Sequence, residues 1–140
     1  MNFTARAFQR NRGPQPSVSV TTVDGRTMNT GNNNDRIDIR AGAFNRGGYA
    51  EATGLNNSSI ATAAGNDSVR IHAHARGMST NAWAMRNSSL DVGPGHDNMD
   101  LRAVTRAGAC DPALGMDNSS SVTGLGNDKL RINAIARGNT

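Results

Sequence analysis

The sequence has little cysteine and few aromatic residues. Cys110 is the only cysteine, so an intrachain disulfide and a thiolate metal site are both excluded. No histidine stands near it in the sequence, and we predict a loop residue rather than a nucleophile. Aromatic residues make up 4% of the 140 residues, so few large side chains can fill a core. Small residues stacked between the coils of a repeat protein offer another way to build one.

Catalytic motifs are also missing. Glu51 is the only glutamate, which excludes a glutamate pair for acid–base chemistry. There is no Ser-His-Asp or Cys-His arrangement in a recognisable context, and no glycine-rich loop of the phosphate-binding type. We therefore predict that the protein is not an enzyme.

The sequence has no long apolar stretch. Residues 1–23 carry Arg6, Arg10 and Arg12 but no apolar segment of the secretory-signal type. No segment approaches the length of a membrane-spanning helix, and we expect no membrane insertion. Cytoplasmic residence and leaderless export both stay open; of the two, we expect an extracellular or cell-surface location.

Negative charge is scarce relative to positive charge. The net charge is +4, the isoelectric point is near 10.5, and Lys129 is the single lysine among the basic residues. A basic protein can attract nucleic acid, anionic glycans or an anionic membrane surface. Because the arginines are scattered along the sequence, we interpret them as a solvated surface. Nucleic acid is not favoured as a partner, and an anionic glycan stays open.

What the sequence does contain is one motif in four copies. The copies occupy residues 31–39 (GNNNDRIDI), 63–71 (AAGNDSVRI), 93–101 (GPGHDNMDL) and 124–132 (GLGNDKLRI). The motif aspartates are separated by 32, 30 and 31 residues and are Asp35, Asp67, Asp97 and Asp128. A repeat in this range is typical of solenoids.

Apolar and polar residues alternate after each aspartate. In the second copy the apolar residues are Val69, Ile71 and Ala73, two, four and six residues after Asp67. Alternation with a period of two is typical of a strand with one buried face. A second strand is predicted before each corner, with apolar residues in one column: Met28, Ile60 and Leu90, which Ser121 continues. The sequence therefore predicts an all-β, single-domain parallel β-solenoid of about four coils, with about 30–32 residues in each.

The repeat divides the chain into successive coils. We expect one domain over 1–140, made of an N-terminal half coil and turn at 1–23 and coils at 24–56, 57–86, 87–117 and 118–140. The half coil is inferred because residues 5–10 match residues 41–46 and residues 17–23 alternate as a strand does. Gly13, Pro14 and Pro16 predict a turn between them. The segments that return to the next motif end in a third apolar column, Leu55, Met85 and Met116, and should form a third wall.

Small and polar residues stand at the predicted corners. Before the last three aspartates the pairs are Gly65 and Asn66, Gly95 and His96, and Gly126 and Asn127. We predict positive φ angles for the glycines of these pairs, because glycine adopts them without steric cost.

Two polar columns are predicted to face outward. Three residues after the aspartates the charge alternates, which predicts attraction between neighbouring coils along Asp38, Arg70, Asp100 and Arg131. An Asn-Ser-Ser triplet begins three coils, at Asn57, Asn87 and Asn118. Each triplet matches the N-glycosylation acceptor pattern, and each also suits a hydrogen-bonded ladder of stacked side chains, which we favour.

The corner motif resembles the hemolysin-type, or RTX, calcium-binding repeat. The family consensus is G-G-x-G-x-D-x-U-x, where U is a large aliphatic residue, and residues 63–71, 93–101 and 124–132 match its G-x-D-x-U part. The resemblance implies a parallel β-roll whose corner aspartates bind calcium, here Asp67, Asp97 and Asp128, with Asp35 a weaker match. The alternative is a structural role in which each carboxylate accepts backbone N–H groups at its turn.

Three functions are compatible with these features. The leading hypothesis is a structural subunit, because both ends of the repeat read as strands without a polar cap; we expect copies to stack head to tail into a filament or matrix fibre. The second hypothesis is a secreted module that folds on binding calcium. The third is binding of an anionic polymer through the arginine-bearing face, with Arg40, Arg70, Arg102 and Arg131.

Overall fold

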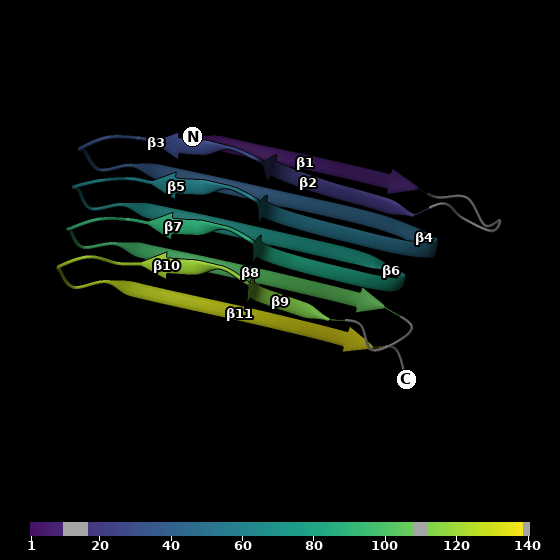
Figure 1. The fold of residues 1–140 in the computed structure, drawn as a ribbon. Helices are drawn as coiled ribbons and strands as arrows, with labels where there is room; N and C mark the ends of the chain where they lie inside the picture. Colours follow the sequence, from purple (N-terminus) through teal and green to yellow (C-terminus); the bar gives the residue numbers. More distant parts are fainter. Residues whose placement is uncertain (10–16, 108–111, 139–140) are drawn as a thin grey trace.

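The strands of the computed structural model wind into stacked coils (Figure 1). The structure describes residues 1–9, 17–107 and 112–138, and every regular element within them is a β-strand. The predicted fold is confirmed: the protein is an all-β parallel solenoid of about four coils. Cys110, Arg10, Arg12 and the turn predicted at Gly13, Pro14 and Pro16 lie outside the described residues.

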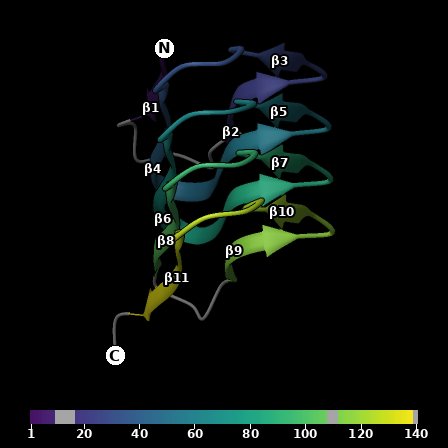
Figure 2. The same ribbon diagram turned by 90° about the vertical axis from the view of Figure 1, so that its left-hand side faces the viewer.

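Each coil passes over three faces. The first face consists of β1 (Asn2–Gln9), the first halves of β4 (Arg36–Asn56) and β6 (Ser68–Arg86), β8 (Asn98–Ala107) and β11 (Lys129–Gly138). The second face consists of β2 (Val18–Asp24), the second halves of β4 and β6, and β9 (Ala113–Asp117). The third face consists of the short strands β3 (Thr27–Asn29), β5 (Ser59–Ala61), β7 (Ser89–Asp91) and β10 (Ser120–Val122). Figure 2 shows the first-face strands above one another on the left.

The register between coils follows the sequence repeat, as predicted. On the first face, parallel pairing aligns Phe3, Ile39, Ile71, Leu101 and Ile132. The second face aligns the predicted third apolar column, Leu55, Met85 and Met116, and the third face aligns Met28, Ile60, Leu90 and Ser121. Because the pairing is parallel and in register, residues about one repeat apart form columns along the solenoid axis.

Strands β4 and β6 cover two faces without interruption. Their register shifts between Asn45 and Tyr49, where the chain bends from the first face to the second. The Asn45 side chain is buried at this bend and its Nδ2 donates to the Tyr49 carbonyl oxygen at 3.0 Å. In the next coil Gly77 pairs with Asn45, and a Cβ there would lie 2.7 Å from the Gly48 carbonyl oxygen. The predicted third wall is therefore the second face, which β4 and β6 form where they continue beyond the first face.

The core has two parts. Large aliphatic side chains fill one part, among them Ile39, Ile71 and Leu101, each 0% exposed. Alanines fill the other part, further along the same strands. Full burial of a large aliphatic side chain contributes about 1.5–3 kcal/mol, so the aliphatic part supplies most of the hydrophobic stabilisation.

One prediction about the corners is wrong. Gly65 and Gly95, two residues before the aspartates, do not adopt positive φ, and of these predicted glycines Gly126 alone does. The left-handed position lies two residues earlier, at Gly31, Ala63, Gly93 and Gly124. The first small residue of the motif therefore supplies the left-handed conformation of the turn.

Close stacking explains why glycine occupies the column two residues before the aspartates. A Cβ on Gly95 would overlap the carbonyl oxygen of Gly65, and a Cβ on Gly126 would overlap that of Gly95. Gly65 lies in the same way against the carbonyl oxygen of Asn33. Asn33 itself stands at the end of this column among the described residues, which is why a side chain is accommodated there.

Ala63 is the one non-glycine residue in the left-handed column, with φ at 61°. An L-residue in this region costs about 1–2 kcal/mol, which glycine avoids. Replacing Ala63 with glycine should therefore raise the free energy of unfolding by about 1 kcal/mol. Urea titration followed by far-UV circular dichroism measures the change. Ala64→Gly is the matched control, because Ala64 has no positive φ, and equal effects of the two substitutions would contradict the prediction.

Candidate functional site

The motif aspartates form a column at the corner between the third and first faces. The Oδ1 atoms of the last three accept the backbone N–H of the aspartate one coil earlier: Asp67 from Asp35 at 2.8 Å, Asp97 from Asp67 at 2.8 Å and Asp128 from Asp97 at 3.0 Å. Asp67 and Asp97 are each only 2% exposed. The carboxylates therefore take the place of backbone carbonyls in the hydrogen bonding between coils.

The residues just before the aspartates form a second ladder, which points outward. Their side chains accept N–H groups from the following coil: Asn34 from Asn66 at 2.7 Å, Asn66 from His96 at 2.9 Å and His96 Nδ1 from Asn127 at 3.0 Å. His96 accepts through Nδ1, so the proton of its neutral ring lies on Nε2. The two ladders run in opposite directions and tie each corner to both of its neighbours.

The geometry of the aspartate column favours a structural role. The Oδ1 atoms of Asp67, Asp97 and Asp128 are used by backbone N–H groups. The Oδ2 atoms of Asp35, Asp67 and Asp97 are buried and have no hydrogen-bond partner among the residues that the structure describes. Calcium takes six to eight oxygen ligands. Across the described ranges, no three His, Cys, Asp or Glu side chains are grouped so that they hold a metal ion. Calcium binding through the Oδ2 atoms stays a prediction.

Burial in the stacked corners disfavours the ionised form of Asp97. Burial raises the pKa of this carboxyl, and the nearby carboxylates of Asp67 and Asp128 raise it further, against the lowering effect of the hydrogen bond from the Asp67 N–H. A pKa raised on folding means that the charged form destabilises the native state at higher pH. The destabilisation disappears as the pH falls through the folded-state pKa.

Two substitutions of Asp97 separate its charge from its hydrogen bond. Asp97→Asn keeps an Oδ1 acceptor, so it should be at least as stable as the wild type near about pH 7, with an advantage that shrinks toward about pH 4. Asp97→Ala leaves the buried Asp67 N–H unsatisfied and should cost about 1–3 kcal/mol. Urea titrations over this pH range measure both effects.

Calcium provides the second arm of this experiment. If the aspartate column has a structural role, neither calcium nor a chelator changes the free energy of unfolding of the wild type or of Asp97→Asn. A calcium-dependent gain in the wild type that the asparagine variant lacks would contradict this role and would establish ligation.

The Asn-Ser-Ser triplets mark the bend between the second and third faces. Asn57, Asn87 and Asn118 have φ angles of 47°, 48° and 44°, and Gly25 with φ at 61° is their counterpart in the first coil. Asparagine tolerates the left-handed region better than most residues. The triplets therefore supply a turn before each short third-face strand.

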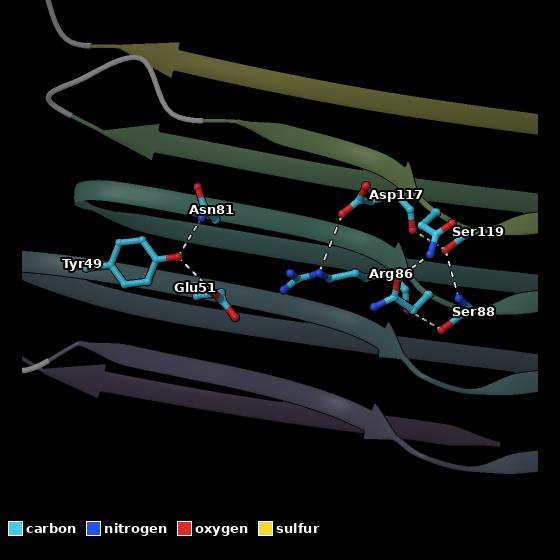
Figure 3. Close-up of polar contacts among 9 residues, drawn as sticks. Tyr49, Glu51, Asn81, Arg86, Ser88, Asp117 and Ser119 are labelled. Atoms are coloured by element: carbon cyan, nitrogen blue, oxygen red, sulfur yellow. Dashed lines mark hydrogen bonds and ion pairs between the residues drawn. The ribbon is translucent and has the colours of Figure 1, made fainter.

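The first serine of each triplet joins neighbouring coils. Ser88 Oγ accepts the Ser58 N–H at 3.1 Å and donates to the Arg86 carbonyl oxygen at 2.7 Å. Ser119 Oγ accepts the Ser88 N–H at 3.1 Å in the same way (Figure 3). The favoured ladder is thus made by serine hydroxyls, with one amide contact from Asn118 Nδ2 to Asn87 Oδ1 at 2.9 Å. Glycosylation of the three asparagines stays a prediction.

The second face carries a polar network between coils (Figure 3). The Tyr49 hydroxyl donates to Glu51 Oε2 at 2.7 Å and accepts from Asn81 Nδ2 at 2.7 Å. Burial and the hydrogen bond to Glu51 raise the pKa of Tyr49 to about 12, so its hydroxyl stays protonated at neutral pH. These polar groups serve contacts within the solenoid.

The predicted charge ladder lies in one outward column of the first face. The pairing places Asp38, Arg70, Asp100 and Arg131 next to one another in that order. Asp38 is held chiefly by Arg40 of its own strand, whose Nε and Nη2 lie 2.8 Å from its oxygens, and this hydrogen bonding lowers the pKa of Asp38. Asp100 Oδ2 lies 3.1 Å from His72 Nε2 and 3.8 Å from Arg70 Nε.

Most described basic side chains gather on the first face. Strand alternation directs them outward, and they are Arg6, Arg36, Arg40, Arg70, Arg76, Arg102, Arg106, Lys129, Arg131 and Arg137. Among the described residues of this surface, the acidic side chains are Asp38 and Asp100. The interpretation of the arginines as scattered is therefore corrected, because residues one repeat apart stack on one face. Counting the outward positions of each first-face strand would have found them.

Three of these arginines form an unbroken stack, here called the arginine column. Arg76, Arg106 and Arg137 pair in consecutive coils, and Phe44 and Phe8 continue the column on the other side of Arg76. The Arg76 guanidinium lies 5.7 Å from the centre of the Phe44 ring. Like charges directly opposite in neighbouring strands destabilise a sheet, so this column concentrates positive charge at a cost in stability.

The last coil exposes two apolar residues whose neighbours in the same columns are buried in the core. Leu130 and Ile132 are 43% and 46% exposed, whereas Met99 and Leu101, their partners in β8, are 0% exposed. Strand β11 is one edge of the first-face sheet and β1 is the other. The solenoid therefore presents apolar columns at its edges as well as a charged face.

Searches of protein-family models, curated proteins and solved structures found no match to this chain. Function is therefore inferred from the residues and their geometry. No helix of the length and apolarity needed to cross a membrane occurs in the part of the chain that the structure describes.

Proposed function

We propose that the protein is a structural subunit that stacks head to tail with copies of itself. The observation that carries the proposal is the exposure of Leu130 and Ile132, which occupy columns that are buried in β4, β6 and β8. Full burial of each contributes about 1.5–3 kcal/mol, and an unpaired β-strand beside them offers backbone hydrogen bonds to a neighbour. A second copy supplies both through its own first coil.

The two edges are complementary in register. Extending the columns by one coil places Ile132 against Phe3 of the next copy and Ala134 against Ala5. On the outward side, Arg131 meets Asn2 and Arg137 meets Phe8. No like-charged side chains of β11 and β1 oppose each other in this register, so the parallel ladder continues across the junction without repulsion.

The faces differ in their number of strands, and this difference sets the angle between stacked copies. Within the described residues the first face has five strands, whereas the second and third faces have four each. Pairing β11 with β1 of the next copy leaves one strand spacing of about 4.8 Å unfilled on the opposite side, across a thickness of about 10 Å. A tilt of about 25° between copies closes this gap, so the filament is curved.

The double variant Leu130→Lys/Ile132→Lys tests the interface. Both positions are already exposed in the monomer, so the fold should persist while two buried ammonium groups prevent stacking. Sedimentation velocity of the wild type should show concentration-dependent association, and negative-stain electron microscopy should show curved filaments. The double variant should remain monomeric at the same concentrations.

Met78→Lys is the matched control for this test. Met78 lies in β6, an internal strand of the first-face sheet, and is 61% exposed, so its replacement removes apolar surface away from the edges. It should assemble as the wild type does. A wild type that is monomeric at every concentration, or equal loss of assembly in the control, would contradict the proposal; straight filaments would contradict the junction geometry.

A further inference from the structure

Gly42 stands at the centre of a patch of cationic and aromatic side chains on the first face. Parallel pairing sets its outward neighbours in three rows, which read Thr4, Arg6 and Phe8, then Arg40, Gly42 and Phe44, then His72, His74 and Arg76. Neighbouring rows lie about 4.8 Å apart, and alternate residues along a strand lie about 6.6 Å apart. The missing side chain at the centre therefore leaves a depression with charged and aromatic walls.

The structure contains this depression as a hollow of about 350 Å³. Its lining includes Gly42, Phe8, Phe44 and the two histidines. The Phe8 and Phe44 rings lie 6.3 Å apart, and Phe8 is 67% exposed. The exposed ring of Phe8 and the half-buried ring of Phe44, beside a floor without a side chain, offer an apolar surface to the flat face of a sugar ring.

The positive charge beside the hollow is not balanced within its own columns. Arg76, Arg106 and Arg137 form one column, and Arg6, Gly42, His74, Val104 and Ile135 form the next; neither contains an acid. Partial desolvation lowers the pKa of His74, and the charges of Arg106, Arg76 and Arg102 lower it further. A bound anion relieves the repulsion between stacked guanidinium groups.

We propose that this surface binds an anionic polysaccharide bearing carboxylate or sulfate groups. One sugar ring occupies the hollow over Gly42 against Phe8 and Phe44. Because Arg40 is held by Asp38, the anionic groups of that sugar are bound by Arg6 and Arg76. The polymer continues along the solenoid axis, where the guanidinium groups of Arg106 and Arg137 bind the following anionic groups.

The distribution of aromatic rings distinguishes this ligand from a nucleic acid. Single strands are bound by aromatic platforms on which successive bases stack, beside a positive groove. Here the two rings lie at one end of the column, and the coils that follow present arginines at the same position. This arrangement fits a polymer in which each unit binds a cationic side chain and does not need an aromatic ring to stack on.

Fluorescence anisotropy of the full chain with labelled oligosaccharides tests the proposal. The probes are a sulfated heparin oligosaccharide, oligogalacturonate as the carboxylate source, neutral dextran and an oligo(dT) of equal charge. We expect binding to at least one of the two anionic glycans, weakened steeply by salt, and none to dextran. Preference between these two probes identifies sulfate or carboxylate as the recognised group.

Two variants separate the charge from the hollow. Arg76→Gln/Arg106→Gln should weaken glycan binding at least tenfold and reduce the slope of log K against log salt by about two. Gly42→Val fills the hollow without removing charge and should weaken binding severalfold with an unchanged slope. An added Cβ on Gly42 lies 3.6 Å from Arg6 Cγ, an ordinary contact, so the fold should be retained, which circular dichroism verifies.

Arg26→Gln is the control for loss of charge alone, because Arg26 is exposed and lies outside the first face, just before β3. It should leave glycan affinity within about twofold. Equal weakening by Arg26→Gln and by the single variant Arg76→Gln would overturn the proposal in favour of bulk charge. Unchanged glycan affinity of Gly42→Val would contradict the placement of a sugar ring in the hollow. Tighter binding of oligo(dT) than of both glycans would assign the surface to nucleic acid instead.

Discussion

The fixed distance between the backbones of successive coils is the constraint on which the rest of this structure depends. Parallel pairing holds neighbouring coils about 4.8 Å apart at every position, including the corners. A Cβ on Gly95 or Gly126 would overlap the carbonyl oxygen of the preceding coil, so the corner column must be glycine wherever another corner lies above it. Side chains elsewhere face the same position of the neighbouring coils, so core columns such as Ile39, Ile71 and Leu101 are aliphatic throughout β4, β6 and β8.

This constraint explains why polar groups are buried at the corners. A turning chain cannot align its own N–H and C=O groups with those of the next coil at every residue, and unsatisfied buried groups are costly. Asp67 and Asp97 supply the missing acceptors, and Asn66 and His96 do so on the outward side. Burial inside the corner raises the pKa of Asp97, and the carboxylates of Asp67 and Asp128 in the neighbouring coils raise it further.

The same stacking concentrates charge and apolar surface in places that a single coil would not reveal. Arg76, Arg106 and Arg137 are far apart in the sequence, yet they adjoin on the first face. At the last coil, Leu130 and Ile132 extend the core columns into solvent. The proposed stacking would carry the arginine-bearing face from one copy to the next, so the two proposals describe one extended surface.

Much of the fold follows from the sequence because the repeat fixes the register. The aspartate spacing and the period of two predict which residues pair, as Ile71 with Leu101 shows. Other features required the structure. Which corner residue adopts positive φ depends on the path of the turn, and the clash at Gly95 involves a backbone atom of another coil. The arginine-bearing face follows from the predicted alternation and register once outward positions are counted, whereas the hollow at Gly42 depends on the side chains of both neighbouring strands.

The central claim is that the corners are tied together by side chains of the neighbouring coil. Amide hydrogen exchange, followed by NMR at single residues, tests it most directly. The amides of Asp35, Asp67 and Asp97 donate to carboxylate Oδ1 atoms, so they should exchange as slowly as the amide of Ile71 in the core of β6, although they belong to loops. Exchange at the rate of an unstructured peptide at these three positions would contradict the account.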